Sequence, residues 1–135
     1  RWDTWSADHS LAHIILPTLK MLKEVKNGAP PVDDEDVPEY LRSYMAQPKE
    51  YEWDTDELYF KRWDWVLDEM IWAFEQRELD DDESAFFDHS AVNKNGSLQQ
   101  QMSQIKIDRT ALEEHQKRKQ RAFVLFGKYY QGLWD

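Results

Sequence analysis

The stretch WDWVLDEMIWAFEQ, residues 63–76, decides the fold of this chain. At 100° per residue, its main apolar side chains share one broad face of an α-helix, and they are Trp63, Val66, Leu67, Met70 and Phe74. Its acids form a neighbouring stripe that holds Asp64, Asp68 and Glu75. Because carboxylates one turn apart repel each other, the stripe predicts a cation opposite it. That cation is a metal ion, a basic helix of the same chain or a partner.

Two further stretches predict long helices. The first covers about residues 6–26, with Asp3 or Ser6 as its cap, and Pro17 inside it is expected to kink it. Its apolar positions repeat with the helical period and are Leu11, Ile14, Ile15, Leu19, Leu22 and Val25. The helix that contains residues 63–76 is expected to run from about Trp53-Asp54 to Glu78, with Asp54 and Glu57 as a capping box.

The last long helix is expected to begin at a capping box formed by Thr110 and Glu113. Its predicted buried side consists of Leu112, His115, Ala122, Phe123, Phe126 and Tyr130. Gly127 is expected either to permit close packing or to mark the helix end. Residues 84–104 contain a turn signal at 93–96 but no clear helical or strand pattern.

Residues 27–53 form a long irregular connection that contains four of the five prolines and the acidic run Asp33-Asp34-Glu35-Asp36. Asp36 is a predicted cap for a short helical piece over 38–44. Such long connections tend to be functional, to wrap a neighbour or to move. The predicted fold is therefore all-α, an irregular bundle of three main helices with a long acidic, proline-containing loop, in a single helical domain over residues 1–135.

The amino-acid composition argues against several classes of function. The net charge of −10 argues against binding to nucleic acid or to an anionic membrane surface. The absence of cysteine excludes disulfides and thiolate metal sites. No apolar run approaches 18 residues and no leader peptide is evident, so a cytoplasmic protein is expected, in the host cell if a virus encodes it. Because the chain starts with Arg1, an N-terminal segment is expected to be missing.

His9 and His13 lie one helical turn apart, so both imidazoles share one face. With Asp64 and Asp68 on another helix, a site for zinc, manganese or iron fits inside a bundle. The other interpretation is a pair of surface or core-edge histidines. The zincin motif HExxH is excluded because Ser10 stands in the glutamate position.

The acidic stripe of Asp64, Asp68 and Glu75 has two further interpretations. One is Mg²⁺ binding for phosphate chemistry, although the chain lacks the paired ExxE and ExxD motifs of helical nucleotide pyrophosphatases. The other is salt bridging within the chain, to Lys61 or to the basic run HQKRKQR at residues 115–121. That run is in turn either a phosphate contact or ordinary charge on a helix surface.

The seven tryptophans exceed what one helix face can bury. Trp65 and Trp72 are seven residues apart and share a face distinct from that of Trp63. A helix that is apolar on more than one face is covered by its own fold, by a second copy or by another partner.

Four stretches together resemble an uncharacterised family of short proteins encoded by tailed bacteriophages and found in marine viral sequence. They are WDTWSADHSLAHIILPTLKMLKE (2–24), VDDEDVPEYLRS (32–43), RWDWVLDEMIWAFEQ (62–76) and LFGKYYQGLWD (125–135). The resemblance covers nearly the whole chain and implies a phage origin and residues preceding WDTW. It implies no activity, and no catalytic residue follows from it.

Two functional hypotheses follow. The first is a phage-type accessory protein that binds a protein partner or itself through acidic and Trp-rich surfaces, with contacts at Asp33, Asp34, Glu35, Asp36, Trp65 and Trp72. It predicts that the acidic stripe pairs with Lys or Arg and that apolar surface stays exposed or is closed by a second copy. The second is a metal-dependent hydrolase or metal-binding bundle, with a divalent metal as cofactor. It predicts convergence of His9, His13, Asp64 and Asp68.

Overall fold

A computed structural model describes residues 2–79 and 82–134, and the chain is mostly helical over these ranges. Its α-helices are α1 (Ala7–Val25), α2 (Tyr59–Glu78), α3 (Leu98–Gln104) and α4 (Arg109–Lys128). The strands β1 (Phe87–Asp88) and β2 (Lys106–Ile107) pair antiparallel and are only two residues long. The predicted all-α class is confirmed apart from that short pair.

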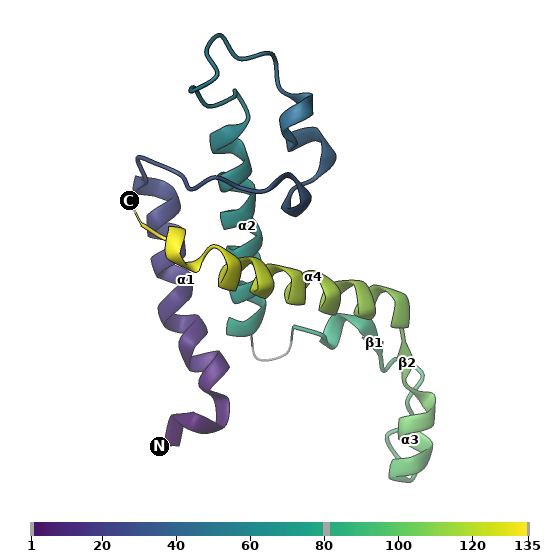
Figure 1. Ribbon diagram of the computed structural model, residues 1–135. Helices are drawn as coiled ribbons and strands as arrows, with labels where there is room; N and C mark the ends of the chain where they lie inside the picture. Colours follow the sequence, from purple (N-terminus) through teal and green to yellow (C-terminus); the bar gives the residue numbers. More distant parts are fainter. Residues whose placement is uncertain (1, 80–81, 135) are drawn as a thin grey trace.

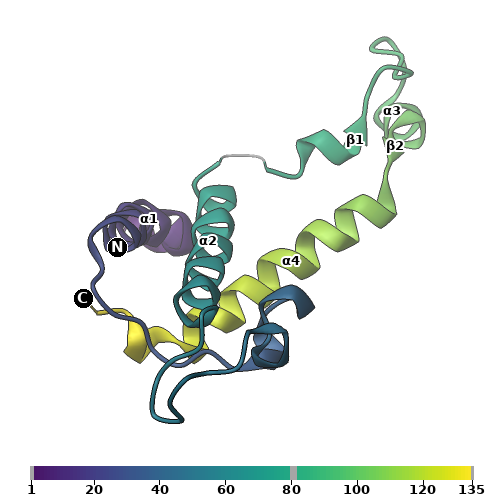
Figure 2. The ribbon, with the colours of Figure 1, turned by 90° about the horizontal axis from the view of Figure 1, so that it is seen from above.

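The helices α1 and α2 lie side by side and run in opposite directions, while α4 crosses them (Figure 1). Two contacts fix this direction: Asp8 near the start of α1 meets Arg77 near the end of α2, and Lys23 near the end of α1 meets Asp68. The view from above shows α3 and the strand pair beyond the far end of α4, away from α1 and α2 (Figure 2).

The core is centred on the α2 face that the sequence predicted. Trp63, Val66, Leu67 and Met70 are fully buried, and Phe74 is buried as well. Each such side chain contributes about 1.5–3 kcal/mol relative to an exposed one. Partners come from α1, from the connection before α2 and from the end of α4, and include Leu16, Leu19, Val37, Leu41, Leu125 and Tyr129.

The predicted start of α2 at residues 53–54 is wrong by about five residues. The carboxylate of Asp54 accepts only from the neighbouring Thr55 N–H, and Glu57 accepts from Gln47 N–H, so no capping box forms. Asp56 instead accepts the N–H of Leu58, and the helix begins at Tyr59.

The connection before α2 contains three short 3-10 turns, at Asp34–Asp36, Glu39–Leu41 and Ser43–Met45. The predicted helical piece over 38–44 is therefore two separate turns. Asp36 does not cap them, because its carboxylate accepts from the Tyr129 hydroxyl. Val37 and Leu41 anchor this connection to the core.

The start of α4 also differs from the prediction. Asp108, and not Thr110, is the cap, and its carboxylate accepts the N–H of Ala111. At the other end, Ala122 is buried as predicted, but Tyr130 is exposed and Tyr129 is buried in its place. Gly127 has open space where a Cβ would lie, so it serves no close packing.

Residues 84–104, which show no clear sequence pattern, contain β1 and α3, and β2 follows shortly after them. Ser97 and Gln100 make a capping box at the start of α3. Phe86 packs against the His115 ring on α4, with ring centroids 5.1 Å apart. The strand pair and α3 therefore contact the rest of the fold mainly through α4.

Helix α1 runs without interruption through Pro17. Only part of its apolar surface meets α2: Ala12, Leu16 and Leu19 are buried. Leu11, Ile14, Met21 and Val25 are each about half exposed or more. The apolar face of α1 is thus wider than α2 covers.

Candidate functional site

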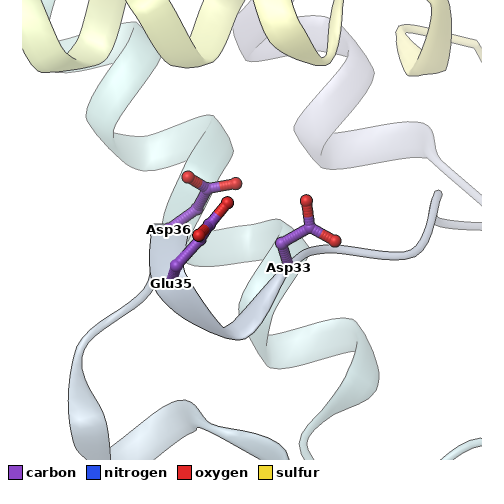
Figure 3. Close-up of side chains that lie close together, drawn as sticks. All are labelled: Asp33, Glu35 and Asp36. Carbon is purple, nitrogen blue, oxygen red and sulfur yellow. The ribbon is translucent and has the colours of Figure 1, made fainter.

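The acidic run has a basic partner inside the chain. Asp33, Glu35 and Asp36 place carboxylate oxygens within 4.8 Å of one another (Figure 3). They form the only such group of three potential metal ligands among residues 2–79 and 82–134. The Lys128 ammonium lies 2.8 Å from Asp33 Oδ2, 2.6 Å from Asp36 Oδ2 and 3.4 Å from Glu35 Oε1. A lysine therefore supplies the positive charge that these acids share.

Tyr129 connects the acidic run, residues 33–36, to the core by hydrogen bonds. Its hydroxyl donates to Asp36 Oδ2 at 2.5 Å and accepts from the Asp33 N–H at 3.0 Å. Burial, together with the hydrogen bond to Asp36, raises the pKa of Tyr129 to about 12. The cluster of Lys128, Tyr129 and the acids thus ties the connection to the end of α4.

The fourth acid of the run, Asp34, contacts a different part of the connection. Its carboxylate accepts from both the hydroxyl and the N–H of Ser43. These hydrogen bonds, together with nearby Arg62, lower the pKa of Asp34. Asp33, Asp34, Glu35 and Asp36 all have partners within the chain, so their predicted role as contacts for another protein stays a prediction.

Two of the three acids in the α2 stripe, Asp64 and Asp68, pair with lysines at the end of α1. Asp64 Oδ1 lies 2.6 Å from Lys26 Nζ, and Asp68 Oδ1 lies 2.5 Å from Lys23 Nζ. The pairing expected under the protein-binding hypothesis is therefore present. Its basic partner is the end of α1 and not the run on α4.

The four predicted metal ligands do not converge. His9 and His13 lie at the start of α1, beside Arg77 and Glu78 at the end of α2. Asp64 and Asp68 lie beside the other end of α1. His13 and Lys23 are ten residues apart, which is about 15 Å along a helix. The antiparallel packing of α1 on α2 therefore separates the two halves of the expected site.

The basic run on α4 is engaged within the fold. His115 Nε2 and Lys119 Nζ lie 2.7 Å and 2.8 Å from Asp82 Oδ2. Burial pushes the pKa of Asp82 up, but the hydrogen bonds from Lys119 and His115 outweigh burial and hold that pKa below its ordinary value. Arg118 adds an ion pair to Glu69 at 2.7 Å.

The two additional tryptophans of α2 are covered by α4. The guanidinium of Arg118 lies 3.8 Å from the centre of the Trp72 ring, and the His115 ring packs edge-on to it. Trp65 packs against the core and is only partly exposed. The fold itself therefore covers most of the surface of Trp65 and Trp72, for which the sequence left the covering partner open.

The outer face of α1 is an uncovered apolar surface, which sequence analysis did not separate from the inner face. It consists of Leu11, Ile14, Thr18, Met21 and Val25, called here the outer stripe. All five residues are exposed, with Ile14 at 66% and Met21 at 58%. Their spacing of three and four residues was visible in the sequence, but the same helix also carries the buried residues at helical spacing.

A groove runs beside the outer stripe. It has a volume of about 450 Å³ and lies between α1 and the end of α4, where Phe126, Tyr130 and Leu133 form its second wall. A neighbouring hollow of about 350 Å³ continues towards Leu11 and Phe74. Most of the side chains that line both are apolar, with Asp8 and Arg77 at the second hollow, so the arrangement suits an apolar helix or a comparable surface better than a polar substrate.

A scan against protein-family models, a search of curated proteins and a search of solved structures each found no match for this chain. Over the described ranges, every helix is too short or too polar to cross a membrane. A function for the chain therefore has to follow from its own residues.

Proposed function

We propose that this chain is a non-enzymatic helical protein that acts by self-association, with the outer stripe of α1 closing against the outer stripe of a second copy. The observation that carries this proposal is the exposure of Leu11, Ile14, Met21 and Val25 on one side of a well-formed helix. Contiguous apolar surface of this kind marks an interaction site more often than a solvent face.

The spacing of the outer stripe supports a second copy as the occupant. From Ile14 to Thr18, Met21 and Val25 the steps are four, three and four residues, which is the seam of a coiled coil. This order is the same in both directions, so an antiparallel second helix presents a matching seam. Ile14 then meets Val25 of the second copy, and the opposed helix dipoles favour that orientation.

Charge supports the same occupant. The whole chain carries a net charge of −10, so two copies repel each other over most of their surface. Helix α1 differs, because Asp8 and Glu24 balance Lys20 and Lys23. It is a segment where two copies can approach without adding to the repulsion.

The exposed apolar area is enough for a weak dimer. Covering the exposed half of each large side chain contributes about 1 kcal/mol, which is half of the value for full burial. Four such side chains in each copy, Leu11, Ile14, Met21 and Val25, together contribute about 8 kcal/mol, against an association cost of about 4–15 kcal/mol. Tyr130, which is 62% exposed and lines the groove, adds to the contact. We therefore expect weak association whose extent rises with the chain concentration.

The sequence also favoured an accessory protein of tailed phages that meets a partner through acidic and Trp-rich surfaces. Phage origin stays a prediction from the resemblance. The self-association proposal moves the contact surface from residues 33–36, Trp65 and Trp72 to α1, because the acids and Trp72 have partners within the chain. It also treats α1, α2 and α4 as the three main helices of an irregular bundle that a second copy completes.

Cross-linking tests the proposed contact, since the chain has no cysteine of its own. We expect Thr18→Cys to yield a covalent dimer with a short bismaleimide, because Thr18 lies at the middle of the outer stripe. Leu98→Cys is the matched control, as Leu98 is 75% exposed on α3, far from α1.

Adding Ile14→Asp to the Thr18→Cys chain should abolish the cross-link, because a charge in the seam weakens association by about 3 kcal/mol, or about 100-fold. Equal yields from Thr18→Cys and Leu98→Cys would contradict the proposal. So would a covalent dimer that survives Ile14→Asp. A Thr18→Cys chain that cross-links only to an added, different protein would also overturn the proposal. The outer stripe would then bind a heterologous partner instead of a second copy.

A further inference from the structure

Two histidines at the start of α1 point their Nε2 atoms at each other. His9 Nε2 and His13 Nε2 are 3.3 Å apart, and the ring planes meet at 86°. The ring centroids are 4.9 Å apart, which is shorter than they would be if both rings and both Nε2 atoms lay on one straight line. The two rings therefore approach each other at an angle, corner to corner.

The separation of the two Nε2 atoms matches a shared tetrahedral ion. Two nitrogens that each lie 2.0–2.1 Å from one zinc ion at a tetrahedral angle are about 3.3 Å apart. The helix sets this geometry, because residues at i and i+4 lie on one face, one turn apart. A hydrogen bond between the two rings has a similar length. The contacts of the other two ring nitrogens are therefore needed to distinguish a hydrogen-bonded pair from a site for a shared ion.

Each ring also places its other nitrogen beside an oxygen of α2. His9 Nδ1 donates to the Arg77 carbonyl oxygen at 2.8 Å, because a carbonyl oxygen can only accept. His13 Nδ1 lies 3.8 Å from Glu78 Oε1. Metal-binding histidines typically hold their second nitrogen by a hydrogen bond to a backbone carbonyl or a carboxylate, which fixes the tautomer and raises the basicity of the ligating nitrogen. His9 makes such a hydrogen bond, whereas the contact of His13 with Glu78 is an electrostatic contact longer than a hydrogen bond.

We propose that His9 and His13 form a two-imidazole site for a borderline divalent ion such as Zn²⁺, with Nε2 of both rings as ligands and with the Arg77 carbonyl and Glu78 orienting them. Solvent completes the coordination, since His13 is exposed. The site is independent of the self-association proposed above. At 100° per residue, His9 and His13 lie on the side of α1 away from Leu11 and Ile14.

The chemistry of the ligands sets the expected selectivity. Imidazole nitrogens suit Zn²⁺, Ni²⁺ and Cu²⁺, whereas Mg²⁺ and Ca²⁺ prefer oxygen ligands. Binding should therefore follow the order Cu²⁺, then Zn²⁺ and Ni²⁺, with no detectable Mg²⁺ binding. Because a protonated imidazole cannot ligate, Zn²⁺ binding should weaken as the pH falls.

Titration of the tag-free full chain with Zn²⁺ tests the site, with calorimetry for affinity and stoichiometry and with NMR of the histidine rings for location. We expect one Zn²⁺ per chain and shifts in the resonances of His9 and His13. His13→Ala should raise the dissociation constant by about 100-fold, because it leaves one imidazole. Glu78→Gln should raise it by about tenfold through the loss of the orienting carboxylate.

His89→Ala is the matched control, because His89 is an exposed histidine far along the chain, and it should leave Zn²⁺ binding unchanged. Unchanged binding in His13→Ala would overturn the proposal, as would ring shifts at His89 or His115 in place of His9. One Zn²⁺ per two chains would also overturn it, since the two ligands belong to one helix. No heat and no ring shifts in the wild-type chain would mean that the histidines form a hydrogen-bonded pair only.

Discussion

Trp63→Ala is expected to lower the free energy of unfolding by about 3–5 kcal/mol, the range for removing a large aromatic side chain from a core. Trp63 is fully buried at the middle of the core, and its ring packs edge-on against Tyr129, with centroids 6.0 Å apart. The same Tyr129 holds the acidic run, so the cavity also loosens the contact of α4 with the connection before α2. Urea unfolding followed by circular dichroism measures the change.

Two further variants serve as comparisons for this expectation. Trp53→Ala removes a tryptophan that is 82% exposed and should change the free energy of unfolding by about 0.5 kcal/mol or less. Trp63→Phe keeps a ring and removes an indole N–H that has no hydrogen-bond partner within the described part of the chain, so it should cost less than Trp63→Ala. A larger loss from Trp53→Ala than from Trp63→Ala would contradict this account of the core.

Arg62→Met is expected to lower the free energy of unfolding by about 3 kcal/mol at pH 7, because it leaves the groups that Arg62 holds without a partner. Arg62 is 3% exposed. Its Nη1 and Nη2 atoms each donate to Asp56 at 2.9 Å, and its Nε donates to the Leu41 carbonyl oxygen at 2.6 Å. One side chain thus joins α2 to two points of the preceding connection.

The loss should depend on pH. Burial raises the pKa of Asp56, but the hydrogen bonds from Arg62 and from the Leu58 N–H outweigh burial and lower it below the ordinary 3.8. A carboxyl with a lowered pKa in the folded state stabilises the fold above its unfolded pKa of about 3.9, and that contribution is lost as the pH falls through the folded value. The difference between wild type and Arg62→Met should therefore shrink below about pH 4.

Unfolding of both chains at pH 7 and at pH 3 measures this effect. Arg121→Met removes an exposed arginine from α4 and should change the stability by about 0.5 kcal/mol or less at both values. A pH-independent loss in Arg62→Met would mean that packing of the side chain, and not its pairing with Asp56, stabilises this part of the fold.

The sequence predicts the parts of this fold that depend on one helix at a time. The buried face of α2 from Trp63 to Phe74 follows directly from the helical period, and it is confirmed. The start of α2 was misplaced because Asp54 and Glu57 fit a capping box by spacing alone. The real start depends on Asp56, whose carboxylate also holds Arg62, a side chain six residues further along.

The candidate surfaces depend on how helices pack, and that is where prediction from sequence failed. Asp68 needed a cation, but the period could not show that Lys23 of the antiparallel α1 supplies it. The apolar positions of α1 span more than one face, and only the placement of α2 shows that Leu16 is buried while Ile14 is exposed. The pattern of His9 and His13 was visible, yet its oxygen partners at Arg77 and Glu78 come from another helix.

The mass of the tag-free chain in solution shows whether α1 brings two copies together. Sedimentation equilibrium over chain concentrations from about 1 to 100 μM detects dimers with an association free energy of about −5 to −8 kcal/mol. Self-association through α1 predicts a mass that rises from 16.3 kDa towards twice that value, and a mass that stays at 16.3 kDa for Ile14→Asp. A wild-type chain that remains at 16.3 kDa over the whole range would contradict self-association through α1.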